Sequence, residues 1–198
     1  MKPPTASKPR ERVLTDAELA EVFTKAHIHQ YSFGRIVTLL ILTGMRRNEV
    51  AHLEWDWIDP DERIITLPST LTKNKHTHTI PYGSLTFEPL EGLSKNSKSL
   101  FPSVSEKGTV FNGWGKSKAR FDKELENVEP YTLHDLRRTF ATVHAKIGTP
   151  IHVTEKLLNH VSGTISGVAA VYNRHSYMDE MRTAVTAYDK YLENLINP

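Results

Sequence analysis

Two side chains suited to phosphate chemistry, an imidazole and a guanidinium, lie three residues apart in the stretch TLHDLRRTFATVHAKIG, as His134 and Arg137. Residues three apart share one face of a helix, so both can point at one object near its N-terminus. That end of a helix favours anions, arginine can bind phosphate with two parallel hydrogen bonds, and histidine can donate or exchange a proton. Taken alone, however, the pair is more typical of a solvated, charged helix face.

A second basic cluster lies in the stretch LTGMRRNEVAHLEW. Gly44 is expected to end one helix, and Arg46 and Arg47 to begin the next. Glu49 lies three residues after Arg46, which is close enough to orient its guanidinium. Considered by itself, this cluster is also typical of surface ion pairing.

Three further polar residues lie in a turn or at a helix end. Lys73 and Lys75 occupy the expected hairpin turn in TLTKNKHTHTIP, where lysines are usually only solvated. His160 ends the short helix EKLLNH, where a lone histidine is more often a cap or a filler than a catalyst.

Two tyrosines lie five positions apart in VAAVYNRHSY, as Tyr172 and Tyr177, with Arg174 and His175 between them. The tyrosine hydroxyl has a pKa of about 10, so a tyrosine nucleophile needs a base or a strongly positive pocket. Tyr177 falls where the last helix begins and is expected to pack or to support its cap. Arg174 and His175 are expected to make local contacts and not to be catalytic.

The composition narrows the classes of protein. The chain has 198 residues, of which 38% are hydrophobic and 24% charged, as in one ordinary globular domain. It has no cysteine, which excludes disulfides and thiolate metal sites and fits a reducing cytoplasm. The N-terminus has no signal peptide, and the longest apolar run is about half the ~20 residues that a membrane helix needs. The net charge of +2 is mild, but basic residues gather locally, as phosphate binding requires.

The elements that must position these residues are mainly helical. Hydrophobic periodicity, capping boxes in TDAE and between Thr132 and Asp135, and glycine stops predict helices over 15–26, 31–44, 47–55, 115–126, 132–147, 150–159, 168–174 and 176–195. The runs RIITLP and THTIPY predict a two- or three-stranded meander, and 83–110 has no firm period. The fold class is therefore mainly α with a small antiparallel β-sheet (α+β). Residues 1–13 are expected to be a linker or chain end, and 14–198 one domain.

Two of these helices have clear apolar faces. Over 132–147 the core face consists of Leu136, Phe140, Val143 and Ile147, and it leaves His134, Arg137 and Ala141 on an adjacent face. The last helix has an apolar seam of Met181, Val185, Tyr188, Leu192 and Leu195. This seam could dock on the domain's own core or on a neighbouring subunit.

Together the clusters resemble the catalytic domain of the tyrosine recombinases, the phage integrase family, over 14–195. TGMRRNE is similar to that family's first arginine box, with Arg46 at the arginine position and Glu49 at the acidic position. The TK of the hairpin is similar to the family's β-turn lysine at Lys73, with Lys75 as a competitor for that role. Single boxes are weak signals, but five boxes in the right order are a strong one.

The remaining boxes lie in the C-terminal half. HDLRRTFAT is similar to the family's most diagnostic box and places His134 and Arg137, LLNH ends in His160, and VYNRHSY places Tyr172 at the nucleophile position. The sequence Tyr-Asn-Arg-His in this box is most similar to that of prophage integrases. The chain departs from the common pattern at Asn159, where the family usually has glycine, and in the longer stretch between His160 and Tyr172.

The resemblance implies that DNA strands are broken and rejoined through a 3′-phosphotyrosine, without a metal or a cofactor. Arg46 and Arg137 would clamp the nonbridging phosphate oxygens, because fixed guanidinium groups stabilise developing charge without reorganising. His134 and His160 would add donors to the same phosphate, and His134 would help to take the tyrosine proton.

The other implied roles concern the bond that forms and the bond that breaks. Tyr172 would attack phosphorus, and Lys73 would protonate the leaving 5′ oxygen as a general acid. Basic residues beside the boxes and in GKSKARFDKE are expected to contact the DNA backbone: Arg47, Lys75, Lys116, Lys118, Arg120 and Arg138.

By resemblance, the partner is double-stranded DNA attachment sites, in integration or excision of a prophage or genomic island. A monomer is expected in isolation and a homotetramer on paired sites. Accessory DNA-bending proteins are further partners that the resemblance allows. The expected location is the bacterial cytoplasm, at the nucleoid during action, with no membrane. The family's N-terminal DNA-clamping domain is absent from this sequence.

Three other classes remain open from the sequence. A noncatalytic DNA-binding module could explain VTEKLLNHVSGTISGVAAVYNR as a helix-turn-helix, but it gives no reason for Arg46, Lys73 and Tyr172 to occur together. A type IB topoisomerase would use similar chemistry to relax supercoils. A histidine metal site is disfavoured, because neither His27/His29 nor His76/His78 has the spacing of a firm ligand set.

Overall fold

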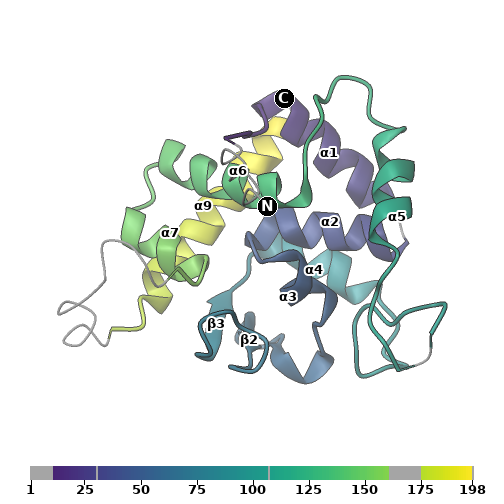
Figure 1. Cartoon of the computed structure of the whole chain (residues 1–198). Coiled ribbons are helices and arrows are strands. Elements are labelled where there is room, and N and C mark those ends of the chain that lie inside the picture. The colour runs from purple at the N-terminus through teal and green to yellow at the C-terminus, as the bar shows by residue number, and fades with distance from the viewer. Residues whose placement is uncertain (1–10, 30, 107, 161–174, 198) are drawn as a thin grey trace, which may run out of the picture.

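α2 (Ser32–Thr43) lies at the centre of the domain and is almost entirely buried (Figure 1). The structure, a computed structural model, describes residues 11–29, 31–106, 108–160 and 175–197. α2 ends at Gly44, whose φ of 61° lies in the left-handed region and whose N–H donates to Leu40 O at 3.1 Å. A Cβ at this position would lie 2.6 Å from the ring of Phe140, so both the backbone and the available space require glycine.

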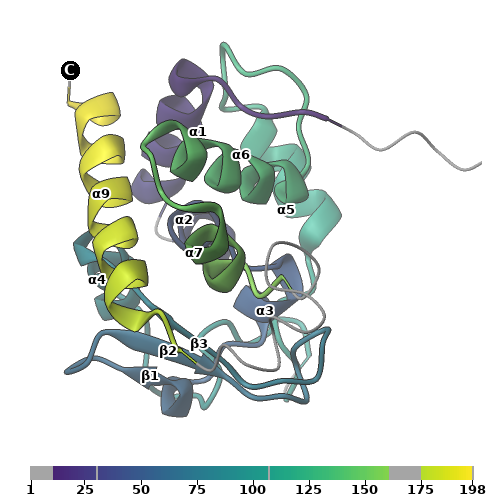
Figure 2. The ribbon, with the colours of Figure 1, turned by 90° about the vertical axis from the view of Figure 1, so that its left-hand side faces the viewer.

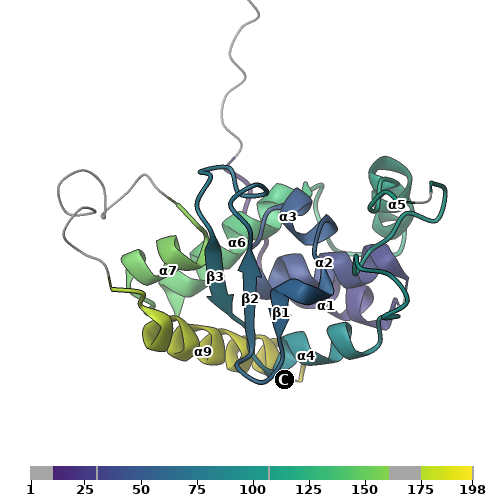
Figure 3. The ribbon, with the colours of Figure 1, turned by 90° about the horizontal axis from the view of Figure 1, so that it is seen from below.

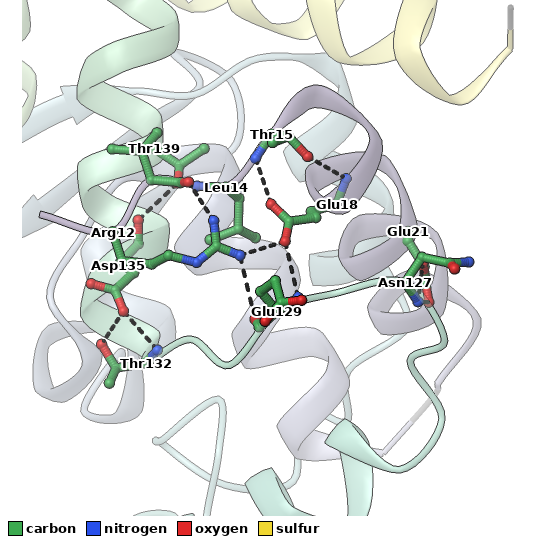
Figure 4. A network of polar contacts seen from close by, with 11 residues as sticks. Arg12, Leu14, Thr15, Glu18, Glu21, Asn127, Glu129, Thr132, Asp135 and Thr139 are labelled. Atoms are coloured by element: carbon green, nitrogen blue, oxygen red, sulfur yellow. Dashed lines mark hydrogen bonds and ion pairs between the residues drawn. The ribbon is translucent and has the colours of Figure 1, made fainter.

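α1 (Asp16–Ile28) begins with the predicted capping box between Thr15 and Glu18. Glu18 is buried, and its carboxylate also accepts from the Arg12 guanidinium and from the Glu129 N–H (Figure 4). The N–H of Leu14 donates to Thr139 Oγ1 at 2.9 Å, which ties the same segment to α6 (Leu133–Lys146). The folded domain therefore reaches back to Arg12, which lies inside the stretch expected to be a linker.

The sheet is a three-stranded antiparallel meander in the order β1 (Ile58–Asp59), β2 (Ile64–Leu67) and β3 (His78–Pro81). Ile65 pairs with Ile80 and Leu67 with His78, and all four residues are buried. β3 is the strand nearest α7 (Ile151–Leu157), as Figure 3 shows. The predicted class, mainly α with a small antiparallel sheet, is confirmed.

Two segments differ from the prediction because contacts distant in sequence decide them. The helix expected over 47–55 is only α3 (Arg47–Ala51), since the following backbone pairs with residues 98–100, with Leu100 N donating to Leu53 O at 2.9 Å. A short 3₁₀ turn, η1 (Trp55–Trp57), then leads to the sheet. The segment 83–110, which has no firm period, contains α4 (Ser84–Glu91). Asp189 supports the start of this helix, because its Oδ2 accepts from the Leu85 N–H at 3.0 Å.

α5 (Trp114–Asp122), α6 and α7 form in the predicted places with slightly different ends. α6 begins with the predicted capping box between Thr132 and Asp135. Leu136, Phe140 and Val143 on its core face are buried, as predicted. The helix expected over 168–174 lies outside the described residues.

α9 (Met178–Ile196) runs along the domain from the sheet towards α1 (Figure 2). Its seam residues Met181, Val185, Tyr188 and Leu192 are buried against the domain's own core. The Tyr188 hydroxyl donates to Ile41 O at 3.0 Å, which satisfies its one buried polar atom. The seam therefore docks on its own domain in this structure. No helix in the described ranges is long and apolar enough to cross a membrane.

Candidate active site

A cavity of about 710 Å³ brings together five of the six residues predicted to be catalytic. Arg46, at the start of α3, and Lys73, in the β2–β3 turn, line one part of it. His134 and Arg137 come from α6, and His160 follows α7. The remaining lining residues are Asn74, Arg138, Ala141, Leu158 and Asn159.

Arg137 is the most deeply held of these side chains, with a relative exposure of 6%. Its guanidinium donates to Gly44 O at 2.6 Å and to Leu158 O, which are the C-terminal carbonyls of α2 and α7. These carbonyls carry the partial negative charge of helix ends, so they suit a buried cation. Burial lowers the pKa of Arg137 to about 10, with the neighbouring Arg46 as a second cause, so Arg137 stays charged at neutral pH.

Arg46 is oriented by Glu49, as the spacing predicted. The Arg46 N–H donates to Glu49 Oε2 at 2.7 Å, and its Nη1 donates to Glu49 Oε1 at 2.8 Å. Glu49 is 3% exposed, so the carboxylate is fixed in the core and the guanidinium lies between it and the cavity. Arg46 and Arg137 thus supply two fixed positive charges to one cavity.

The two histidines lie at the edge of this positive cluster. Partial burial first, and then Arg138, Arg137 and Arg46, lower the pKa of His134. Burial followed by Arg137 and Arg46 lowers the pKa of His160 in the same way. Both imidazoles are therefore neutral near pH 7, a form that can accept a proton on one nitrogen and donate a hydrogen bond from the other.

His160 is placed by a Schellman motif at the end of α7. Its N–H donates to Glu155 O at 2.9 Å, and the Asn159 N–H donates to Lys156 O at 3.1 Å. Asn159 has a φ of 52°, in the left-handed region. This backbone position explains why the sequence departs from glycine at little cost, because asparagine tolerates the left-handed region better than most residues.

Lys73 and Lys75, which the sequence did not separate, have different positions. Lys73 lines the cavity, whereas Lys75 is exposed and is not among the lining residues. The turn is held by Thr72, whose buried hydroxyl donates to His76 O at 2.7 Å. Of the two lysines, Lys73 is the one that can reach a group bound in the cavity.

A second cavity, of about 600 Å³, shares Arg46, His134 and Arg137 with the first. The guanidinium of Arg47 lies 4.9 Å from the ring centroid of Trp114, and Lys118 Nζ lies 3.7 Å from that of Tyr131. Among the residues predicted to contact DNA, those that line one of the two cavities are Arg47, Lys118 and Arg138. Those that do not are Lys75, Lys116 and Arg120, which are all exposed.

Tyr172, the predicted nucleophile, and Arg174 lie outside the described residues. Tyr177 is the N-cap of α9, and its ring centroid lies 5.0 Å from that of His152 and 4.7 Å from that of His175. It lines neither of the two cavities. Two of the histidines of the metal alternative have other partners: His78 Nε2 donates to Lys156 O at 2.8 Å, and His27 Nε2 lies 3.1 Å from Glu88 Oε2. Within the described ranges no three potential ligands form a metal site.

Sequence reasoning missed Asn74 as a cavity residue. It lies between two lysines in the turn, and its hydrogen-bond partner Asn159, which also lines the cavity, is distant in sequence. Only the tertiary structure reveals this pair.

The fold is that of the tyrosine recombinase catalytic domains. The crystal structure of the XerA recombinase is similar over 98% of this chain and 65% of its own, with 20% identity and a TM-score of 0.66. A lambda integrase (75-356) dimer bound to a COC′ core site is similar over 81% of this chain and 62% of its own, with 19% identity and a TM-score of 0.61.

The model of the phage integrase family matches residues 12–178, and the chain belongs to that family. It is 27% identical to the prophage integrase IntZ of Escherichia coli (strain K12) over 170 residues, which cover 81% of this chain and 39% of that protein. It is 26% identical to the integrase of Shigella phage Sf6 over 182 residues, covering 82% of this chain and 44% of that integrase. The matched part of the chain thus spans less than half the length of these two relatives.

Proposed function

We propose that this chain breaks and rejoins DNA strands at specific sites, as the catalytic domain of a prophage-type integrase. The observation that carries the proposal is the convergence of Arg46, Lys73, His134, Arg137 and His160, from separate segments of the chain, on one cavity. Membership of the phage integrase family supports the same function.

In the proposed reaction the scissile phosphate binds between Arg46 and Arg137. The transition state carries extra negative charge on the nonbridging oxygens, and two guanidinium groups fixed by Glu49 and by helix carbonyls stabilise it without rearranging. The neutral imidazoles of His134 and His160 can donate N–H groups to the same oxygens.

The covalent step exchanges one phosphoester for another. The Tyr172 oxygen attacks phosphorus and forms the 3′-phosphotyrosine, while the bond from phosphorus to the 5′ oxygen breaks. His134 takes the tyrosine proton, and the ammonium of Lys73 gives a proton to the leaving 5′ oxygen. The 5′-hydroxyl of another strand then reverses the step, so the energy of the phosphoester is conserved and no nucleotide is consumed.

The proposed partners follow from the relatives. Solved structures of similar fold include the lambda integrase dimer on its core site and a XerH recombinase bound to a difH substrate. We propose that this chain acts on duplex attachment sites in the bacterial cytoplasm, as a monomer that assembles into a homotetramer on paired sites. The residues that would contact the DNA backbone are Arg47, Lys75, Lys116, Lys118, Arg120 and Arg138. Accessory DNA-bending proteins would be further partners.

The test is a search for the covalent intermediate. Nicked duplexes from the DNA that flanks the gene are incubated with wild type, Tyr172→Phe and the matched control Tyr177→Phe, and adducts are resolved on a denaturing gel and mapped by mass spectrometry. We expect an adduct on Tyr172 in wild type and in Tyr177→Phe, and none in Tyr172→Phe, which should still bind DNA. An adduct that persists in Tyr172→Phe would disprove the assignment. Relaxation of a supercoiled plasmid without strand exchange would indicate topoisomerase chemistry instead.

A further inference from the structure

The turn that carries Lys73 is fastened to the end of α7 by two side-chain amides. Asn74 Nδ2 donates to Asn159 Oδ1 at 2.6 Å, and Asn159 Nδ2 donates to Asn74 Oδ1 at 3.4 Å. Both residues are partly buried and line the cavity beside Lys73 and His160. The amide pair therefore joins two segments that each present a predicted catalytic side chain.

The side chain of Asn159 is not needed for the backbone that it occupies. Its φ of 52° is the left-handed position of the Schellman motif, which glycine fills at least as well. Among the described residues, the hydrogen-bond partner that the amide gains over glycine is Asn74. The contribution of the amide to the turn can therefore be separated from its contribution to the helix end.

On the other side of the pair, Asn74 organises the tip of the turn. Its Oδ1 also accepts the His76 N–H at 3.2 Å, and the Lys75 N–H donates to Thr72 O at 3.2 Å. The end of the turn is anchored separately by His78, the first residue of β3, whose Nε2 donates to Lys156 O at 2.8 Å. The base of the turn is thus held through a buried side chain, and its tip is held by the amide pair.

Lys73 depends on the tip of the turn for its position. It is exposed, and its ammonium lies at the end of a flexible chain of methylene groups, so the place of its backbone decides which atoms it can reach. A tip that leaves α7 would take Lys73 away from the cavity while Arg46 and Arg137 stay in place.

We propose that Asn74 and Asn159 are positioning residues, whose amide pair holds the β2–β3 turn so that Lys73 can protonate the leaving 5′ oxygen. This inference rests on the proposed function. It predicts that loss of the pair impairs leaving-group protonation and spares the phosphate clamp.

The first test compares two leaving groups in single-turnover cleavage by the full chain, at the site where wild type forms its adduct. Asn159→Gly should cleave the ordinary phosphodiester about tenfold more slowly, the effect of losing one hydrogen bond. With a 5′-bridging phosphorothioate, whose thiolate leaves without a proton, its rate should come within about twofold of wild type. Lys73→Ala is the benchmark and should show a larger defect that the same substrate repairs.

The control is a double-variant cycle with Asn74→Ala, which removes the other half of the pair without adding a charge. If the two amides act only through each other, Asn74→Ala with Asn159→Gly should cleave no more slowly than the slower of the two single variants. An Asn159→Gly rate equal to that of wild type, or an equal slowdown on both substrates, would overturn the proposal. No adduct by wild type on any substrate would instead overturn the proposed function.

The second test needs no DNA. Hydrogen exchange measured by mass spectrometry should be faster in Asn159→Gly for peptides over 69–78, and unchanged for peptides over 133–146. Unchanged exchange over 69–78 would overturn the proposal whatever the cleavage data show, because the amide pair would then not hold the turn.

Discussion

The two sides of the cavity are built differently. Arg137 is buried, and its guanidinium is held by the backbone ends of two helices, α2 and α7. Lys73 lies on an exposed turn, which is joined to the end of α7 by the side-chain pair of Asn74 and Asn159. The group proposed to hold the phosphate is thus part of the core, whereas the group proposed to deliver a proton lies on an exposed turn. Stability and activity should therefore respond differently on the two sides.

The largest expected effect is on the core side. Arg137→Ala should slow cleavage by about 10³-fold, because it removes a fixed donor from the transition state. It also leaves the carbonyls of Gly44 and Leu158 without their donor, so the free energy of unfolding should fall by about 2 kcal/mol. Adduct formation and urea denaturation measure the two effects. A variant with wild-type stability would show that this side is not part of the core.

On the turn side the expectation is a loss of activity without a loss of stability. Lys73→Ala should slow cleavage by about 10²-fold, as expected for loss of a general acid. Because Lys73 is exposed, the free energy of unfolding should change by no more than about 0.5 kcal/mol. Lys75→Ala, in the same turn but not in the lining of the cavity, is the control and should keep the wild-type rate of cleavage on bound DNA. A slow Lys75→Ala and a normal Lys73→Ala would instead identify Lys75 as the general acid.

Acid should destabilise the core side through His144, at the other end of α6. Its imidazole is buried, and the centroid of this ring lies 4.3 Å from that of Phe140 and 4.9 Å from that of Tyr188. Burial lowers the pKa of His144 to about 4. Between about pH 6.5 and 4 the unfolded chain binds a proton that the folded chain does not, so stability is complete above this window and falls as the pH drops through it. The loss from His144 reaches about 3 kcal/mol at pH 4.

Urea denaturation at pH 7 and pH 4.5 checks this prediction, with His144→Leu as the control. The difference in unfolding free energy between the two pH values should be smaller in His144→Leu than in wild type. An equal difference in both proteins would show that His144 titrates normally in the folded chain.

The smallest expected effect lies outside both cavities, on the exposed face of α5. Lys116→Ala should weaken DNA binding by about fivefold, without changing the rate of cleavage on bound DNA. It should also reduce by about one the slope of the logarithm of the binding constant against the logarithm of salt concentration. Binding measured over a range of salt concentrations tests this. An unchanged salt dependence would remove Lys116 from the DNA-contacting surface.

The parts of this molecule that were predictable from the sequence are those decided by near neighbours. The capping boxes at Thr15 and Thr132 and the glycine stop at Gly44 are local devices, and each appears where the sequence placed it. The shortened α3 and the unexpected α4 depend on contacts with residues 98–100 and with Asp189, which no local pattern contains.

The same division holds in the site. The resemblance supplied the identities of Arg46, Lys73, His134, Arg137 and His160, and the structure places them around one cavity. Helical spacing indicated Glu49 as the support of Arg46, but neither spacing nor the resemblance indicated the carbonyl of Gly44 for Arg137 or the amide of Asn159 for the turn. Supports of this kind join segments distant in sequence, so only the packed structure reveals them.

The contacts of Arg12 also determine how mechanical load would enter the domain. A pulling force applied to the chain ahead of residue 11 would act first on Arg12, which is bound to Glu18 and lies 3.3 Å from Glu129 O, and then on Leu14, which is bound to Thr139 of α6. The load would therefore reach the helix that carries His134 and Arg137 before it reached the β2–β3 turn. Tension at this end of the chain would act on the Arg137 side of the cavity first, and it would reach the Lys73 side only through the contacts of Arg137 with Leu158 and of Asn159 with Asn74.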